Sequence, residues 1–508
     1  MIQRRGLLLG AAALAAAPRI VWGDAGLTPE GLIERARARA QRPHRPVSRD
    51  LAPPFDRLDY DSYRGVHPVA GKAAALPLGS QFRADLLPPG WLFREPVRIS
   101  LPGHDTAFAP DMFSYDPALI DLPIPLPDMG KTGFSGLRLL HPLNRRDHWD
   151  EVLVLQGASY FRALAQDTVY GLSARALALG TGGARPEEFP LTEEIHVFEA
   201  DDSVHFGCLI DSPRASAALI ARLTPGRSTR MACSLHLFAR EVLADAGIAP
   251  LTSMFQHSAL GPARIDDFRP AVHDSAVLVI DNGAGERLWR PLANPARVQM
   301  SAFVDDAPRG FGLVQMPSDF TDFQDAEAQY HRRPSAWVHP REGWGPGALR
   351  LLEIPTENEF ADNIVAFWRP EAPLAPGAHQ FDYDLDWLPP GLAALPASGH
   401  PLHPVRMASG VDPGARNARL FVLDVTGHPP QSADPMRPDI EASAGVQIGG
   451  VAFYPLAQMD RVWRLSFLLT PEDSTDMAEL RLRLRGADGT DMTPVWLYRW
   501  TRPAAGGV

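Results

Sequence analysis

The sequence predicts an all-β protein in which a large N-terminal β-sandwich is followed by a smaller, immunoglobulin-like β-sandwich. Short apolar runs of strand length recur along most of the chain, whereas helical periodicity is scarce. The 50 prolines and 42 glycines are spread along the chain, as turns between many strands require. A chain of 508 residues also exceeds one ordinary core, so at least two domains are expected.

Residues 1–25 are predicted to be a twin-arginine signal peptide. Arg4 and Arg5 precede a short, weakly apolar stretch over residues 6–17, and residues 23–25 offer a plausible cleavage position. The stretch is too short to cross a bilayer, which needs about 20 apolar residues. The alternative is an uncleaved anchor or a chance arginine pair. Because twin-arginine export carries folded proteins, the mature chain is expected in the periplasm with its signal removed.

Residues 26–389 are predicted to form the large β-sandwich domain. It begins with a helix that runs from Pro29 to about Gln41, with Thr28 as its N-cap. Further short helices are expected at residues 161–165, 239–246 and 322–330. Strands are predicted at the apolar runs 92–99, 152–155, 195–199, 205–210, 217–223, 231–238, 276–280, 298–303, 311–315, 349–354, 364–368 and 381–385.

Residues 390–402 read as a linker, because they are rich in Pro, Gly, Ala and Leu without strand periodicity. Residues 403–508 then hold six or seven strand-like runs. The clearest are 419–425, 463–468 and 480–485, and the last alternates leucine with arginine, so one face is expected to be buried and the other wet. This size and strand count predict an immunoglobulin-like sandwich.

Composition and motifs exclude several functions. The net charge of −11 argues against a nucleic-acid partner. The 16 histidines form no HExxH or His-x-His pattern, so no metal site is expected, and the absence of phosphate loops and dinucleotide motifs predicts no cofactor. Cys208 and Cys233 lie in strand-like runs. Both are predicted to be buried free thiols, and a disulfide between them is the alternative in an oxidising compartment.

A chain-long series of motifs resembles one known family. Examples are Thr132-Gly133-Phe134-Ser135-Gly136, Val272-His273-Asp274-Ser275 and Asp362-Asn363-Ile364-Val365-Ala366. The remaining motifs lie at residues 157–162, 170–175, 187–190, 250–255, 269–270, 289–292, 308–313 and 332–337. Together they resemble the periplasmic glucan biosynthesis family OpgG/OpgD, and the twin-arginine signal is more similar to the OpgD branch.

The resemblance implies a periplasmic glycoside hydrolase that cleaves β-1,2-glucan internally with inversion. Asp362 matches the family's general acid and Asp274 its general base. Two alternatives stay open: a transglycosylase that forms cyclic or branched glucan, and a non-catalytic glucan-binding partner of a membrane glucosyltransferase. The resemblance also makes a homodimer a reasonable expectation. Residue type alone predicts that Asp362 is a turn residue beside Asn363. It predicts that Asp274 is an ion-pair partner of Arg269 or His273.

Four further residues are candidates for sugar binding. Tyr160 and Arg162 lie in one motif, and Trp337 and Trp344 offer large flat rings. His273 is expected to be a packed neighbour rather than a catalyst.

Two acids and two departures from the family pattern complete the sequence-based picture of the cleft. Glu357 and Glu359 are expected to add negative charge near Asp362 and so raise its pKa. Ala276 follows Ser275 where the family usually has Asp, and residues 316–318 replace arginines. Both departures are expected near the cleft and bear on the reaction outcome.

Overall fold

The computed structural model describes residues 27–120, 132–261, 266–391, 395–415 and 417–502, so the predicted signal peptide lies outside the described residues. Two α-helices occur there, α1 (Pro29–Ala40) and α2 (Tyr60–Arg64). Thr28 caps α1 as predicted, because its Oγ1 accepts a hydrogen bond from the Gly31 amide at 3.2 Å. Within the described residues no helix is long and apolar enough to span a membrane.

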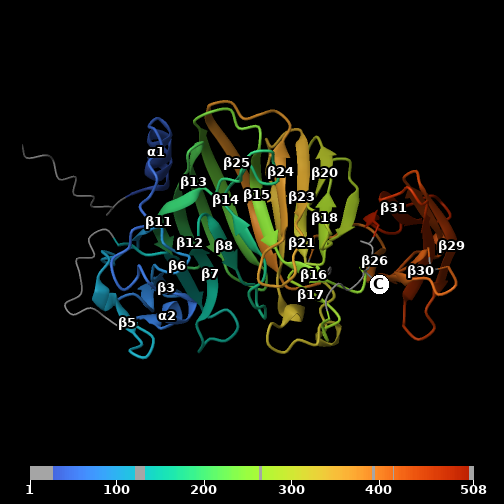
Figure 1. Cartoon of the computed structure of the whole chain (residues 1–508), viewed down its shortest axis with the longest axis horizontal. Helices are drawn as coiled ribbons and strands as arrows, with labels where there is room; N and C mark the ends of the chain where they lie inside the picture. Colours follow the sequence, from blue (N-terminus) through green and yellow to red (C-terminus); the bar gives the residue numbers. More distant parts are fainter. Residues whose placement is uncertain (1–26, 121–131, 262–265, 392–394, 416, 503–508) are drawn as a thin grey trace, which may run out of the picture.

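Two large sheets dominate the described structure (Figure 1). The first has eleven strands, in the order β2 (Leu76–Leu78), β3 (Phe82–Leu87), β6 (Gly136–His141), β7 (Asp150–Gln156), β8 (Tyr160–Ala163), β9 (Ser173–Arg175), β15 (Ala246–Ser253), β24 (Ile364–Pro370), β23 (Gly347–Glu353) and β20 (Gln299–Asp305), with β10 (Ala178–Leu179) beside β15.

The second large sheet has thirteen described strands, in the order β28 (Arg437–Ala442), β31 (Met477–Arg485), β32 (Val495–Thr501), β19 (Arg287–Pro291), β18 (Val277–Asp281), β21 (Gly310–Val314), β22 (Ser335–Pro340), β25 (Gly377–Leu388), β14 (Thr229–Ala239), β13 (Ala215–Thr224), β12 (Val204–Asp211), β11 (Leu191–Ala200) and β4 (Arg98–Ser100). Small pairs join β1 (Val66–Pro68) to β5 (Phe113–Tyr115) and β16 (Phe255–His257) to β17 (Val272–His273).

The two large sheets pack face to face, which confirms the predicted sandwich. One continuous buried cluster contains Leu137 and Leu139 of β6 together with Leu219 of β13 and Leu235 of β14. These strands alternate core-facing and outward-facing residues, so each sheet supplies one apolar face. Burying those two faces against each other removes the apolar area from water and stabilises the sandwich.

The C-terminal region lies at the opposite end of the molecule from α1 (Figure 1). A four-stranded sheet has the order β26 (Leu402–Val411), β27 (Arg419–Gly427), β30 (Val462–Pro471) and β29 (Val446–Pro455). The other three strands of this region, β28, β31 and β32, continue the second large sheet, because β32 pairs in parallel with β19. The seven strands match the expected number, and the domain boundary at 390–402 stays a prediction.

The predictions of three short helices inside the large domain are wrong. Residues 161–165 begin in β8, and residues 239–246 run from the end of β14 to the start of β15. Residues 322–330 form a loop between the 3-10 turns η2 (Phe320–Asp322) and η3 (Tyr330–Arg332). The described residues also contain the 3-10 turns η1 (Pro110–Met112) and η5 (Gln431–Ala433). Short apolar runs have no periodicity that separates strand from helix, and sheet pairing decides such cases.

Both cysteines are free and buried, as favoured from the sequence. Cys208 lies in β12 and Cys233 in β14, and β13 separates the two strands. Burial raises the pKa of the Cys208 thiol to about 12, so it is protonated at neutral pH.

Helix α1 is joined to the edge of the second sheet through one buried carboxylate. Glu194 of β11 is 1% exposed and forms ion pairs with Arg35 of α1, Arg98 of β4 and His196. Burial alone would raise the Glu194 pKa, but the hydrogen bond from His196 and the two arginine charges outweigh it and hold the pKa at about 2. The ionised carboxylate is therefore part of the fold.

Replacing Glu194 by glutamine is expected to lower the free energy of unfolding by about 3 kcal/mol at pH 7. The folded-state pKa lies below the ordinary value of 4.5, so this stabilisation is present above pH 4.5 and is lost as the pH falls towards 2. Urea denaturation at pH 7 and pH 3 tests this. Glu193→Gln is the matched control, because Glu193 also pairs with an arginine of α1, Arg39, at 2.7 Å, but burial outweighs that pair and raises its pKa. Equal effects of the two substitutions would contradict the expectation.

Candidate active site

A pocket of about 520 Å³ lies against the first large sheet and contains three of the predicted site residues, Asp362, Tyr160 and Arg162. Strands β7, β8 and β9 form its floor, and Asp362 reaches it from the connection that precedes β24. The other lining residues are Phe93, Glu151, Val154, Gln156, Gly157, Phe161, Tyr170 and Ser173. The lining combines aromatic rings, an arginine and carboxylates, a set suited to a polar ligand with apolar faces.

Strand alternation places Tyr160 and Arg162 together. They stand two residues apart in β8 and share one face, whereas Phe161 and Ala163 are buried. The Arg175 guanidinium lies 4.5 Å from the centre of the Tyr160 ring. Burial raises the pKa of the Tyr160 hydroxyl to about 12, so it is a neutral hydrogen-bonding group at physiological pH.

Asp362 lies at the rim of the pocket and its residue is exposed to solvent. The protein around it still displaces enough water to raise the pKa of its carboxyl, while Arg162 and Arg175 act in the opposite direction. The next residue, Asn363, fixes the backbone, because its side chain accepts from the Phe255 amide at 2.8 Å and donates to the Ile354 carbonyl at 2.9 Å. Asp362 thus stands on a tightly held strand start.

Asp274 is buried, and only 7% of the residue is exposed. Desolvation raises the pKa of its carboxyl to about 6. The charges of Asp362 and Glu359 add to this rise, and those of Arg333 and Arg162 oppose it. An Arg333 nitrogen lies 3.4 Å from Asp274 Oδ1. Arg333 also donates to the carbonyl of Tyr170, which lines the pocket together with Asp362, so Asp274 lies beside that pocket although 88 positions separate the two aspartates in the chain.

Three expectations about the surroundings of the aspartates need correction. Arg269 forms ion pairs with other acids, Asp267 among them. The arginine that pairs with Asp274 is Arg333. Glu359 acts on Asp274 rather than on Asp362, and Glu357 is not among the causes of either shift.

His273 is a packed neighbour as expected. It stacks on Phe255 with ring centres 5.4 Å apart, and its Nδ1 donates to Gln315 Oε1 at 2.8 Å.

The two predicted tryptophan contacts are corrected by the structure. Trp337 is 1% exposed and lies in a hydrophobic cluster with Trp289 and Trp496. Trp344 is 5% exposed, and its indole N–H donates to the Asp382 carbonyl at 3.0 Å. Protein atoms cover both rings, so neither ring has a face exposed for contact with a sugar. The flat area that made them candidates also makes them good core residues.

Sequence reasoning missed Arg333, Arg175 and Tyr170 as site residues. Arg333 pairs with Asp274 and donates to the Tyr170 carbonyl. Arg175 lies under Tyr160 and forms an ion pair with Glu187 at 2.6 Å. All three lie in motifs that carried the family resemblance, which is the signal that could have found them.

One residue of each departure from the family pattern lies in the core, whereas Pro317 is partly exposed and Ser318 is exposed. Ala276 and Met316 belong to one apolar cluster that also contains Trp289 and Trp337, and neither lines the pocket. The expectation that these positions border the cleft is therefore corrected for both side chains.

Fold and site together define a β-sandwich protein that carries a pair of carboxyl groups beside an aromatic and arginine-lined pocket. Within the described residues, no three His, Cys, Asp or Glu side chains gather as metal ligands would. The family model described as "Periplasmic glucan biosynthesis protein, MdoG" matches residues 28–500, and the chain belongs to this family. The chain is thereby placed among proteins of glucan biosynthesis in the periplasm.

Curated relatives agree with this assignment. The chain is 40% identical to "Glucans biosynthesis protein G" of Vibrio cholerae over 481 residues, which cover 92% of this chain and 86% of the relative. It is 39% identical to the protein of that name from Shewanella frigidimarina over 493 residues, covering 94% and 85%. A solved chondroitinase AC lyase aligns over 69% of this chain and 41% of its own at 10% identity, with a TM-score of 0.16, too low to bear on fold or function.

Proposed function

We propose that the protein is a glycoside hydrolase that cleaves β-1,2-glucan internally with inversion, using Asp362 as general acid and Asp274 as general base. The observation that carries this proposal is a pair of carboxyl groups in different environments: Asp362 lines the pocket, and the buried Asp274 is linked to the pocket residue Tyr170 through Arg333. Inverting hydrolysis requires two carboxyl groups with different protonation states.

In the proposed reaction, the protonated Asp362 donates its proton to the glycosidic oxygen as the bond to the anomeric carbon breaks. A water molecule attacks that carbon from the opposite face, and its proton passes to Asp274. A glucan chain seated over Asp362 would exclude water from the exposed carboxyl and raise its pKa further, as an acid requires. With a pKa of about 6, Asp274 is mostly ionised at neutral pH, as a base requires.

The proposal assigns substrate contacts to Tyr160 and Arg162. The neutral Tyr160 ring offers an apolar face and a hydroxyl, and the exposed Arg162 offers several N–H donors to sugar hydroxyls. Arg162 also lowers the pKa of both aspartates, so it links substrate binding to the protonation of the acid and the base.

One experiment separates hydrolysis from the two alternatives. Purified protein is incubated with linear β-1,2-glucan, and reducing ends and products are measured. New reducing ends support hydrolysis, and an α-configured first product supports inversion. A constant bond number with cyclic or branched product would show transglycosylation, and an unchanged polymer would leave only glucan binding.

We further propose export by the twin-arginine pathway, assignment to the OpgD branch, work alongside a membrane glucan glucosyltransferase and assembly as a homodimer. The paired Arg4 and Arg5 support the export route. Replacing both arginines by lysine is expected to retain the precursor in the cytoplasm, and cell fractionation measures this.

Sedimentation of the mature protein tests whether it forms a homodimer, and cross-linking in cells tests whether it contacts a membrane glucan glucosyltransferase.

A further inference from the structure

We infer that Arg269 is a positioning residue that holds together two loops that carry Arg333 and Asp362 and a third loop that leads through β17 to Asp274. This inference rests on the proposed function for its catalytic consequence. The three loops are residues 266–271, which lead into β17, the connection from β21 to β22, and the connection from β23 to β24.

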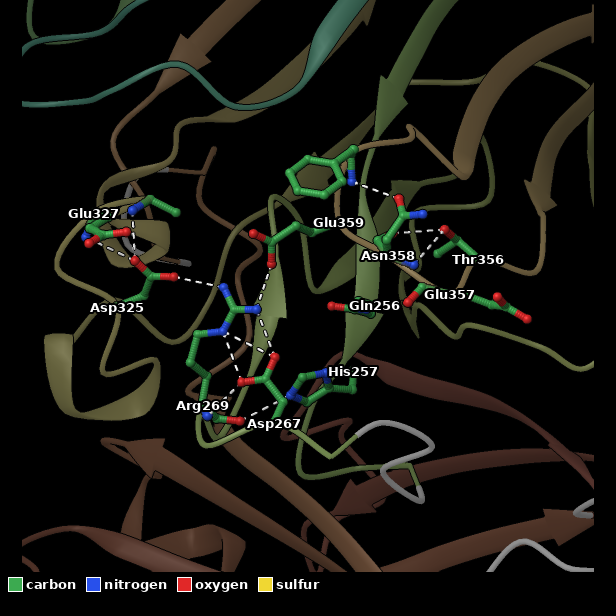
Figure 2. Close-up of polar contacts among 12 residues, drawn as sticks. Gln256, His257, Asp267, Arg269, Asp325, Glu327, Thr356, Glu357, Asn358 and Glu359 are labelled. Atoms are coloured by element: carbon green, nitrogen blue, oxygen red, sulfur yellow. Dashed lines mark hydrogen bonds and ion pairs between the residues drawn. The ribbon is translucent and has the colours of Figure 1, made fainter.

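Arg269 contacts one carboxylate from each of these loops (Figure 2). Within its own loop, it forms a two-pronged pair with Asp267, with Nε–Oδ1 and Nη2–Oδ2 distances of 3.0 and 2.7 Å. Its Nη1 donates to Asp325 at 2.8 Å, and its Nη2 lies 2.6 Å from Glu359. Its backbone carbonyl lies 3.0 Å from His257 Nε2. Each of the three guanidinium nitrogens therefore has a carboxylate partner.

Each bonded loop also supplies a group of the candidate site. The Arg269 loop continues through β17 directly to Asp274, and the Asp325 loop continues through η3 to Arg333. The Glu359 loop ends at Asp362. Because three loops of unrelated sequence meet at one side chain, the relative placement of acid, base and paired arginine depends on it.

The loop ends are already ordered, so Arg269 acts on their relative position. Asp325 Oδ1 accepts from the amides of Glu327 and Ala328 at 2.9 and 2.6 Å, which closes its own turn. The Glu357 carbonyl accepts from Gln256 Nε2 at 3.1 Å at the base of the third loop. Glu359 makes the contact that ties the outer part of this loop to the other two.

Arginine is required at this position because a planar guanidinium can bond three carboxylates in fixed directions, whereas a lysine ammonium is a point charge on a flexible stem. The side chain is 14% exposed, so these ion pairs are less screened than pairs at the surface. The hydrogen bonds of Arg269 also hold the pKa of Asp267 at about 2, so this carboxylate is ionised throughout the working range.

The cluster is also coupled to the base by charge. The charged groups that act on Asp274 are Arg333, Asp362, Arg162 and Glu359, and Arg269 neutralises the last of these. Loss of Arg269 would leave Glu359 as an unpaired negative charge near the base. The loss is therefore expected to change the pH dependence of the reaction rate, which a general loss of stability would not do.

The test compares the wild-type enzyme with Arg269→Gln and Arg269→Lys on linear β-1,2-glucan. Arg269→Gln is expected to lower kcat by about 10²-fold, since loosely held catalytic groups cost that much. KM is expected to change little, because Tyr160 and Arg162 stay in place. The acid side of its pH–rate profile is expected to move to higher pH. Arg269→Lys keeps a positive charge, so it should lower kcat without moving the profile.

Two further variants complete the design. In Arg269→Gln/Glu359→Gln the unpaired charge is gone, so the acid side of the profile should return towards that of the wild type while kcat stays low. Arg464→Gln is the matched control, because Arg464 forms a two-pronged pair with Asp424 at 2.7 and 2.8 Å in the C-terminal four-stranded sheet. It should leave kcat and the profile unchanged.

Hydrogen exchange provides a readout that does not depend on activity. In Arg269→Gln, exchange should rise in residues 266–271, 323–333 and 356–362 and stay unchanged in β12 to β14. A kinetic and exchange behaviour equal to that of Arg464→Gln would overturn the inference, as would a uniform rise in exchange, which indicates general destabilisation. If the wild-type protein cleaves no glucan, the proposed function fails, and the exchange pattern alone decides whether Arg269 positions the loops.

Discussion

Asp362→Asn is expected to lower kcat for β-1,2-glucan cleavage by about 10³-fold, since general acid catalysis contributes about 10²- to 10⁴-fold. Asparagine keeps the shape of the side chain but has no proton to give to the leaving oxygen. Asp362 lies at the pocket rim, so its replacement should leave the fold and the binding of glucan largely unchanged. Reducing-end release under saturating glucan measures kcat, and glucan binding to the variant is measured separately.

The matched control for this experiment is Glu357→Gln. Glu357 is an exposed acid of the same connection, and the contact that the structure gives it is made by its backbone carbonyl. This control should cleave glucan at the wild-type rate. An Asp362→Asn enzyme that kept full cleavage would remove Asp362 from the role of acid, and equal losses in both variants would point to a disturbed loop.

Asp274→Asn is expected to have two opposite effects, the loss of glucan cleavage and a gain of stability at neutral pH. Without a base, the attacking water keeps its proton, and kcat should fall by about 10²- to 10⁴-fold. The wild-type pKa rises from 3.8 to about 6 on folding, which corresponds to about 3 kcal/mol of destabilisation when the group is ionised. Asparagine removes this buried charge, so the variant should unfold at higher denaturant concentration.

The pH dependence follows from the direction of that shift. Because the folded protein holds the Asp274 proton up to about pH 6 and the unfolded chain releases it near pH 4, wild-type stability falls between these values and then stays level. The advantage of Asp274→Asn should therefore appear between pH 4 and 6 and persist above. The same pKa predicts that wild-type activity falls below about pH 6, tenfold for each further pH unit.

Asp386→Asn is the control of opposite sign for stability. Asp386 is also buried, and burial alone would raise its pKa, but His339 at 3.2 Å and the Arg230 hydrogen bonds of 2.8 and 3.0 Å outweigh burial and lower the pKa. Its replacement should destabilise the protein at neutral pH. If both asparagine variants lost stability, Asp274 would be a structural ion-pair residue rather than a buried base.

Much of the fold could be predicted from residue patterns. Runs such as 205–210, 217–223 and 231–238 carry strand-length apolar segments bounded by turns, and the structure has β12, β13 and β14 there. The cap at Thr28 depends on neighbouring residues alone, so it was predictable as well. The runs at 161–165 and 239–246 were misjudged, because helix and strand differ little over so few residues until a partner strand is known.

The site was harder to predict, because its parts come from distant segments. Sequence motifs pointed to Asp274 and Asp362, and strand alternation explains why Tyr160 and Arg162 share a face. Trp337 shows the opposite case. A tryptophan in a strand has the same residue type whether it faces a ligand or the core, and only packing shows that this ring is buried.

By itself, the sequence determined the all-β class, most strand positions and the two aspartates worth testing, because these depend on local pattern and on motifs read along the chain. The tertiary structure alone decided that Asp274 is buried, that Arg333 is its partner, and that Arg269 joins three loops. Burial and charge set a pKa, and both depend on groups brought together from distant parts of the chain. A linear sequence contains the residues for such a site, but it does not show which of its charged groups lose their water when these distant parts meet.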